Sequence, residues 1–373
     1  MKFQPGEIVA KRYRVDGFHL KGGMQEVYRC FDLALDRVVA LKTPREGIID
    51  KRFNRGAQMG ARVVHPNVAA TLDYVEEGAH RCLVEEFIEG SDLGRRLLND
   101  FVFLDPSLAA WIVSNMARGI QAAHKVKICH RDLKPSNIMT SSDGHMSLIK
   151  LTDFGIAKLA EKELESEIEK FGQDENTLTS SNTLLGAVPY LAPECWVDWS
   201  SSGQPADIWA FGAIAYHLLL GKPPFGGGKG AIMAMARAQL AGKVELSQPG
   251  WFGKHKESTR LEQELWTLVE NCLQVDPARR LTADEVVERC QALCYSVSPR
   301  KVGVIKNYPY KYRNGGTAKA GFIEVDGEGP TFFHSSEFFG AGVNPKVGQR
   351  VSFGSVAGVP RDRCSPVLLL RSS

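Results

Sequence analysis

Four short motifs, which follow one another in a chain of 373 residues, constrain the fold more than any other feature. The segment VALK (residues 39–42) comes first, and HRDLKPSN (residues 130–137) comes next. The apolar run LIKLT then leads to DFG (residues 153–155), and APE (residues 192–194) follows. Phosphoryl transfer requires cations at the phosphates, carboxylates for Mg²⁺ and a carboxylate that faces the attacking hydroxyl. The four motifs contain each of these residue types.

Together the four motifs resemble those of the protein kinase family. The resemblance implies that Lys42 contacts the α- and β-phosphates of ATP. It implies that Asp132 orients or deprotonates the substrate hydroxyl and that Lys134 steadies the transferred phosphoryl group. A lysine at position 134 is typical of Ser/Thr kinases. Asn137 and Asp153 would hold Mg²⁺, so ATP and Mg²⁺ are the implied cofactors and protein Ser/Thr side chains the implied substrates.

The same resemblance implies the fold and the supporting residues. We expect an α+β, bilobal kinase fold with a β-rich N-lobe at about 8–88 and a helical C-lobe at about 89–294. Asp207 resembles the buried aspartate that braces the catalytic loop, and Arg280 resembles the partner of Glu194. The residues expected around the nucleotide are Gly22, Gly23, Val27, Ala40, Glu86 and Ile88.

The phosphate-binding loop departs from the family pattern. The segment GGMQEVY (residues 22–28) resembles the loop GxGGMGEVY of bacterial kinases. Leu20 and Gln25, however, stand where the first and third glycines of GxGxxG occur. Glycines matter here because they let backbone N–H groups approach a phosphate closely. We therefore expect either a looser contact with the nucleotide or a stiffer loop.

A second departure concerns the partner of Lys42. The helix predicted over residues 50–64 carries Gly56 where the family has the glutamate that pairs with this lysine. Glu85 stands at a position that is usually apolar, at the back of the nucleotide pocket. A buried carboxylate is costly unless it is paired. One hypothesis is that Glu85 replaces the missing glutamate, and the alternative is that Glu85 is protonated or turned to solvent.

The activation segment, residues 153–194, contains the acidic stretch 161–175. A cluster of hydroxyl residues follows, and Arg131 beside the catalytic aspartate is typical of kinases whose loop is ordered by phosphorylation. A plain polar loop is the alternative. Ala187 stands where many Ser/Thr kinases have threonine, which affects peptide specificity. The predicted phosphorylation sites are Thr177, Thr179, Ser180, Ser181 and Thr183.

The C-terminal part of the chain differs from the rest in charge and pattern. Residues 296–373 hold 11 Lys and Arg against 5 Asp and Glu, a net charge of +6. After a linker at 295–300, residues 301–371 resemble a cold-shock domain, a small OB-type barrel. Such barrels bind single-stranded RNA or DNA by stacking bases on aromatic residues beside a basic groove. The candidate residues for this contact are Lys306, Tyr308, Phe322, Phe332 and His334.

Three stacking positions of that family are lost. Asn307, Ala320 and Ser335 stand where aromatic residues occur. Because each stacked base contributes about 1–3 kcal/mol, we expect weaker binding than an intact surface gives. The aromatic and basic segment YPYKYR (residues 308–313) can compensate. The alternative is a barrel that docks proteins and binds no nucleic acid.

The remaining features suggest a soluble, cytoplasmic protein without a membrane segment. The eight cysteines include no CxxC pair, and the first residues contain no apolar core of a signal peptide. The most apolar stretch, 208–220, is shorter than the ~20 residues that span a bilayer. The main alternative to an active kinase is a pseudokinase scaffold. The Gly56 substitution and the poor glycine loop favour it, whereas the intact catalytic residues oppose it.

Overall fold

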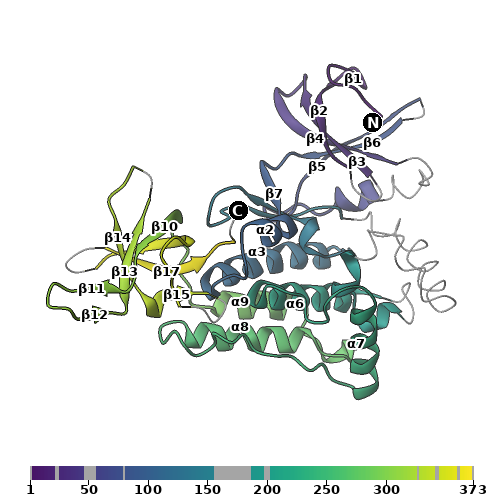
Figure 1. The fold of residues 1–373 in the computed structure, drawn as a ribbon. Coiled ribbons are helices and arrows are strands. Elements are labelled where there is room, and N and C mark those ends of the chain that lie inside the picture. Colours follow the sequence, from purple (N-terminus) through teal and green to yellow (C-terminus); the bar gives the residue numbers. More distant parts are fainter. Residues whose placement is uncertain are drawn as a thin grey trace.

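The N-terminal part of the chain folds into one antiparallel sheet, drawn in purple and blue in Figure 1. Its strands are β1 Ile8–Val9, β2 Tyr13–Lys21, β3 Gln25–Asp32, β4 Arg37–Pro44, β5 Thr71–Glu77 and β6 His80–Glu86, in the order β1-β2-β3-β4-β6-β5. Successive side chains of a strand point to opposite faces. One cluster of buried side chains includes Tyr13, Tyr28, Leu41 and Val84, and Phe3 from the N-terminal segment packs against it.

This computed structural model describes residues 2–21, 25–45, 56–78, 80–154, 186–196, 202–325, 327–340, 344–358 and 362–371. Gly22 and Gly23, the acidic stretch 161–175 and the predicted phosphorylation sites at 177–183 lie outside these residues. Residues 56–60 are helical, and turns follow, whereas the sequence predicted a helix as far as residue 64.

The middle of the chain is helical and surrounds one large apolar core. Its helices are α2 Leu93–Asn99, α3 Pro106–Lys125, α6 Gln204–Leu220, α7 Gly228–Ala241, α8 Thr259–Cys272 and α9 Ala283–Ala292. Asp105 caps α3 by accepting hydrogen bonds from the N–H groups of Ser107 and Leu108. Thr282 and Glu285 form a capping box at the start of α9.

A small sheet of three short strands combines a strand that precedes α2 with two strands that follow α3. Its strands are β7 Gly90–Asp92, β8 Ile138–Ser141 and β9 Ile149–Leu151. The loop before β8 contains HRDLKPSN, and Asp153 follows β9 closely. Because β8 and β9 are antiparallel neighbours, the sheet brings these two motifs to the same end.

The C-terminal part of the chain forms a closed barrel of five strands, which lies beside the helices in green and yellow (Figure 1). These strands are β10 Lys301–Asn307, β13 Ala320–Glu324, β14 Thr331–His334, β16 Arg350–Val356 and β17 Arg363–Leu369. They pair in the order β14-β13-β10-β16-β17, and a parallel pairing of β14 with β17 closes the ring. Ile305, Ile323, Phe333 and Phe353 fill its interior.

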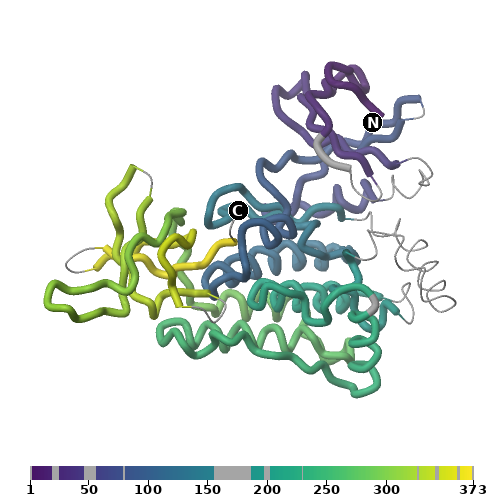
Figure 2. Tube along the Cα trace, viewed as in Figure 1, coloured from purple at the N-terminus to yellow at the C-terminus, as the bar shows by residue number. Residues whose placement is uncertain are grey.

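The barrel packs directly against the helical part, as the traces in Figure 2 also show. The short strand β15, Phe338–Phe339, contributes Phe339, whose ring stacks on His255 with the centroids 3.8 Å apart. Leu370 forms an isolated bridge with Phe101. Residues 295–300 contain neither helix nor strand, yet Arg300 is buried in an ion pair. The segment expected to be a linker is therefore anchored to the helices.

A search of the described residues for membrane-crossing segments finds no helix that combines the necessary length and apolar character.

Candidate active site

The loop at residues 130–137 places two polar side chains against one carboxylate. Lys134 Nζ lies 2.9 Å from Asp132 Oδ1 and 2.8 Å from Oδ2. Asn137 Nδ2 donates to Asp132 Oδ2 at 3.0 Å and to the Asp132 carbonyl at 2.7 Å. A single 3₁₀ turn, Pro135–Asn137, brings the amide back toward the aspartate.

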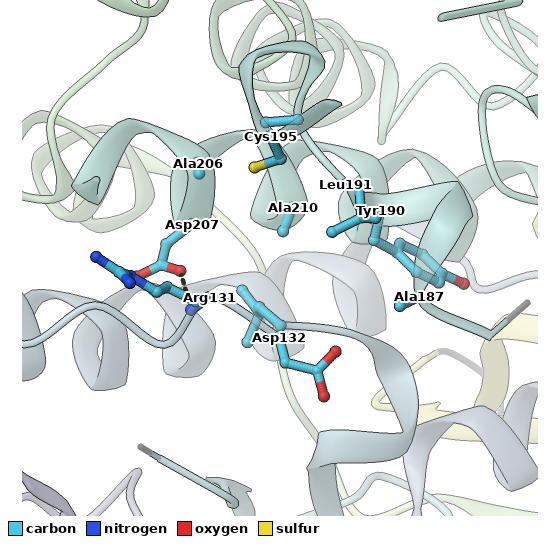
Figure 3. Close-up of a pocket in the computed structure, with 11 residues that line it drawn as sticks. Arg131, Asp132, Ala187, Tyr190, Leu191, Cys195, Ala206, Asp207 and Ala210 are labelled. Carbon is cyan, nitrogen blue, oxygen red and sulfur yellow. Dashed lines mark hydrogen bonds between the residues drawn. The ribbon is translucent and has the colours of Figure 1, made fainter. Parts of the chain in front are cut away.

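Asp207, at the start of α6, supports this loop from behind (Figure 3). Its two carboxylate oxygens accept hydrogen bonds from the backbone N–H groups of His130 and Arg131, each at 2.7 Å. His124 Nε2 lies 2.8 Å from one of the same oxygens. Burial opposes the charge, but the contact with His124 and the N–H groups hold the pKa of Asp207 below its ordinary value. Arg131 has φ +64°, and this strained backbone persists because Asp207 holds it.

The predicted pair of Glu194 and Arg280 is also present. Arg280 donates two parallel hydrogen bonds to the Glu194 carboxylate, at 2.6 and 2.8 Å. The guanidinium is completely buried and lies over the ring of Trp209. Bidentate pairs of this kind combine strength with a fixed geometry. This pair ties the end of the activation segment to the segment between α8 and α9.

Strand register brings the N-lobe candidates to one face of the first sheet. Val27 lies opposite Lys42, which lies opposite Leu83, and Ala40 lies opposite Glu85. Directly opposite residues of antiparallel strands share a face, as do residues two apart on a strand. Lys42, Ala40, Val27 and Glu85 therefore project from the same side of the sheet, toward Asp153.

Lys42 contacts two carboxylates. Its Nζ atom lies 2.5 Å from Glu85 Oε2 and 2.8 Å from Asp153 Oδ1. The side chains of Lys42 and Glu85 are only 8% and 5% exposed. The ion pair that the sequence suggested in place of the missing helix glutamate is thus present, and Glu85 does not turn to solvent. Gly56, at the expected glutamate position, has no side chain to offer.

The charges of this cluster stabilise one another. Burial disfavours the ammonium group of Lys42, yet Asp153 and Glu85 together raise its pKa above the ordinary value. Burial also disfavours the charged form of Asp153, but Lys42 and Gln25 hold its pKa below the usual range. Burial raises the pKa of Glu85, against the attraction of Lys42. Two carboxylates share one lysine, so the positive charge of a further cation would be favourable in this buried cluster.

The other nucleotide candidates lie nearby with different environments. Val27, Ala40 and Ile88 are buried, at 8%, 7% and 8% exposure, and supply apolar surface. Glu86 forms an ion pair with Lys150 at 2.8 Å, so its carboxylate is engaged outside the Lys42 cluster.

The sequence argument missed one residue of the site. It treated Gln25 only as a lost glycine, whereas Gln25 Nε2 donates to Asp153 Oδ1 at 2.7 Å. The available signal was its spacing, because Gln25 is two residues from Val27 on β3 and so shares the face of Lys42.

A pocket next to Asp132 adjoins the catalytic loop on the side of the activation segment (Figure 3). Apart from Arg131, Asp132 and Asp207, its lining is apolar or weakly polar and includes several small side chains. Members of this lining are Leu133, Ala187, Tyr190, Leu191, Ala206 and Ala210.

On the barrel, the structure brings together only part of the predicted surface. Phe322 and Phe332 are paired across β13 and β14, with ring centroids 5.9 Å apart. The ring of Tyr310, from the aromatic and basic segment 308–313, lies 5.7 Å from that of Phe322. Tyr308 instead stacks on the buried Phe333 and belongs to the barrel core.

The two polar candidates of the barrel are both exposed. Lys306 forms an ion pair with Glu324 at 2.9 Å, which reduces the positive charge that it offers. His334 accepts a hydrogen bond at Nδ1 from the backbone N–H of Ser336. His334 is two residues from Phe332 on β14, so both face outward from the barrel.

A model of the protein kinase domain matches residues 21–290. Over 242 residues the chain is 36% identical to the probable serine/threonine-protein kinase PknB of Lactococcus lactis. The aligned region covers 63% of this chain and 36% of that protein. It is 33% identical over 239 residues to the serine/threonine-protein kinase PrkC of Bacillus subtilis, with 63% and 34% covered. Over 257 residues it is 31% identical to the serine/threonine-protein kinase PkaA of Streptomyces coelicolor, with 66% and 41% covered.

The chain therefore spans between 34% and 41% of the length of these three relatives. The matched range, 21–290, extends over more than half of the chain and ends before the barrel begins at Lys301. It contains Lys42, the catalytic loop and Asp153, which the fold places together. On these grounds the chain belongs to the protein kinase family.

Proposed function

We propose that this chain is a Ser/Thr protein kinase, which transfers the γ-phosphoryl group of ATP to a protein hydroxyl. The observation that carries the proposal is the catalytic loop, where Lys134 and Asn137 both hydrogen-bond the carboxylate of Asp132. The Asp132 side chain is 25% exposed, so a substrate hydroxyl can reach it. Three relatives carry the name serine/threonine-protein kinase, which supports the same class.

The proposed step requires little from the protein beyond position and charge. The substrate oxygen forms a bond to the γ-phosphorus while the bond between that phosphorus and the ADP oxygen breaks. The hydroxyl proton passes to Asp132. Lys134, in contact with Asp132, supplies positive charge for the phosphoryl oxygens.

The donor atoms of the site fit Mg²⁺ and the phosphates of ATP. Asp153 and Asn137 offer carboxylate and amide oxygens, and Mg²⁺ is usually held by one or two carboxylates together with substrate phosphates. When bound, Mg²⁺ neutralises charge on the phosphates. Lys42, which Glu85 and Asp153 hold in place, would contact the α- and β-phosphates.

The walls of the site suit the base of the nucleotide. Val27, Ala40 and Ile88 are apolar and buried, which favours a flat aromatic ligand between them.

Phosphoryl transfer to protein is the direct test. Purified chain is incubated with ATP labelled at the γ-phosphorus, with Mg²⁺ and a general Ser/Thr substrate. We expect label in the wild type and none in Asp132→Asn, because an amide cannot accept the hydroxyl proton. Asp284→Asn, which changes an exposed carboxylate that accepts a hydrogen bond from Gln121, is the matched control. Equal labelling in wild type and Asp132→Asn would contradict the proposal.

The pseudokinase alternative rests on the missing helix glutamate. Because Glu85 supplies a buried carboxylate to Lys42, the departure at Gly56 no longer argues strongly against activity. Unlabelled wild type that still binds nucleotide would favour the scaffold.

We further propose that the kinase phosphorylates its own activation segment. The candidate positions lie outside the described residues, and Arg131 beside the catalytic aspartate motivates the proposal. Mapping of phosphopeptides from active chain should place sites within residues 156–191. Sites confined to other regions would contradict it. The candidates are Thr177, Thr179, Ser180, Ser181 and Thr183.

For the barrel we propose an OB-type, cold-shock-like domain that binds single-stranded nucleic acid. Its strand order and parallel closure support the OB assignment. The specific observation in favour of binding is the cluster of Tyr310, Phe322 and Phe332, three partly exposed aromatic rings. Phe322 and Phe332 lie on the barrel sheet, and Tyr310 packs against Phe322 from a separate two-stranded sheet. Bases stack on such clusters with little sequence preference. A protein-docking role is the alternative.

A further inference from the structure

We infer that Gln25 is a positioning residue for the metal-binding carboxylate Asp153. The inference rests on the proposed function, and it names a member of the site that the family pattern does not contain. Gln25 stands at a position where the family has a glycine, so its side chain adds a polar group to the roof of the nucleotide site.

The geometry of Gln25 is set by the sheet. Gln25 is the first residue of β3 and lies opposite Pro44 on β4. Two residues later Val27 lies opposite Lys42, so Gln25 and Lys42 project from the same face. Both reach one atom: Asp153 Oδ1 lies 2.7 Å from Gln25 Nε2 and 2.8 Å from Lys42 Nζ.

Asp153 needs such support for two reasons. Its backbone has φ +64°, a conformation that is strained for a residue other than glycine and persists only when the surroundings hold it. Its other main partner, Lys42, also serves Glu85, so one lysine is divided between two carboxylates. The amide of Gln25 supplies a second donor to the same oxygen of Asp153.

The second atom of the amide points to a cation. With Nε2 directed at Asp153, the carbonyl oxygen Oε1 of Gln25 is buried and meets no hydrogen-bond donor among the described residues. A buried acceptor without a donor is unfavourable. Next to the carboxylate that holds Mg²⁺, a cation or the water bound to it can satisfy this oxygen. Gln25 therefore holds Asp153 through one atom and offers the other to the metal.

A role in metal binding predicts a specific pattern of affinities. Removal of the amide should weaken the Mg²⁺-dependent part of nucleotide binding, because Asp153 loses a donor and the metal loses an acceptor. Binding without Mg²⁺ should change little, because the contacts of Lys42 and of the apolar wall remain.

The experiment measures the affinity of the full chain for ADP by calorimetry, in EDTA and across a Mg²⁺ titration. In Gln25→Met, which keeps the length of the side chain, the Mg²⁺ concentration for half-maximal enhancement should rise roughly tenfold. Affinity in EDTA should stay within about twofold of wild type. Gln121→Met, which changes a partly exposed glutamine on α3, should match wild type in both conditions.

The outcomes separate the inference from the proposed function. Wild type that binds ADP neither with nor without Mg²⁺ contradicts the proposed function. Wild type that shows Mg²⁺-enhanced binding, together with an unchanged Mg²⁺ requirement in Gln25→Met, overturns the inference. Equal weakening with and without Mg²⁺ also overturns it, because a merely structural role predicts that result. Gln25→Gly, which restores the family residue, repeats the comparison if the methionine variant is less stable.

Discussion

At the residue scale, the site shows how a missing charge can be replaced from another element. Lys42 requires a buried carboxylate because an unpaired ammonium group in such surroundings is costly. Gly56 cannot supply it, and Glu85 on β6 does, at 2.5 Å. A strand residue is fixed by its ladder of hydrogen bonds, so this partner does not depend on the position of a helix.

Glu85→Met should impair both stability and nucleotide binding. Removal of one partner of a buried pair costs about 3 kcal/mol, because the other charge loses its compensation. Asp153 still contacts Lys42, so we expect a folded chain with a lower urea midpoint and weaker ADP binding. Glu328→Met, which breaks an exposed pair with Lys301, is the control. Activity equal to or above that of wild type would refute the replacement of the helix glutamate by Glu85.

At the scale of elements, alternation along two strands creates the aromatic surface of the barrel. Phe332 and Phe333 are neighbours on β14, and they face opposite sides. Phe333 fills the barrel, while Phe332 meets Phe322 from β13 at the surface. Tyr308 follows the end of β10 and is not part of this surface, because its ring stacks on Phe333.

Phe332→Ala should weaken single-strand binding by ~1–3 kcal/mol, the contribution of one stacked base. The measurement is fluorescence anisotropy of labelled polypyrimidine with the full chain at low salt. Phe18→Ala, a partly exposed phenylalanine on β2 of the N-lobe, should leave binding unchanged. Identical affinities for wild type and Phe332→Ala, or no binding at all, would contradict the nucleic-acid proposal and favour the protein-docking alternative.

The burial of one histidine against another element makes the stability of the fold depend on pH. The hydroxyl of Tyr190, in the 3₁₀ turn Val188–Tyr190, lies 2.7 Å from His217 Nδ1 on α6. Burial lowers the pKa of His217 to about 4. The unfolded chain therefore takes up this proton near pH 6.5 and the folded chain only near pH 4. Stability from this group is present above pH 6.5 and falls as the pH drops from 6.5 to 4, by roughly 3 kcal/mol.

His217→Gln should remove this part of the pH dependence. Urea unfolding at pH 7 and pH 4.5 should show a smaller loss in the variant than in wild type, because glutamine does not titrate. His334→Gln, an exposed histidine on the barrel, should behave like wild type. The same loss in His217→Gln and wild type would show that His217 is already charged in the folded chain.

At the scale of the whole molecule, a buried ion pair contributes to the contact between the barrel and the helical part. Arg300 Nη2 lies 2.6 Å from Asp105 Oδ2, and both side chains are at most 5% exposed. Asp105 also caps α3, so the pair connects the start of the barrel to the longest helix. Arg371, near the other end of the barrel, donates to the carbonyl groups of Leu97 and Phe101.

Arg300→Met should lower the free energy of unfolding by about 3–5 kcal/mol, because it leaves Asp105 buried and without its cation. Urea unfolding of the full chain, followed by tryptophan fluorescence, is the measurement. Lys301→Met, one residue further along, breaks only an exposed pair with Glu328 and should cost less than ~1 kcal/mol. Equal stabilities of the two variants would contradict a structural role for the Arg300 pair.

What the sequence determined by itself is mostly local. The contacts of Lys134 and Asn137 with Asp132 span at most five positions, so the motif HRDLKPSN contains almost all of their geometry. Strand alternation also determines which side chains of one strand share a face. The pairing of Glu85 with Lys42 was one of two alternatives that the sequence left open, and the register of two neighbouring strands decided it.

Only the tertiary structure decided the contacts between distant segments. Gln25 and Asp153 are 128 positions apart, and His255 meets Phe338 across 83. The pattern along a strand indicates which face of the sheet a side chain occupies. It does not indicate which group of a distant segment that side chain meets in the folded chain. The opposing group depends on tertiary packing. The large apolar core holds Phe339 and Leu370 of the C-terminal part against the helices, whereas the N-terminal sheet has a cluster of its own and reaches Asp153 through Lys42 and Gln25.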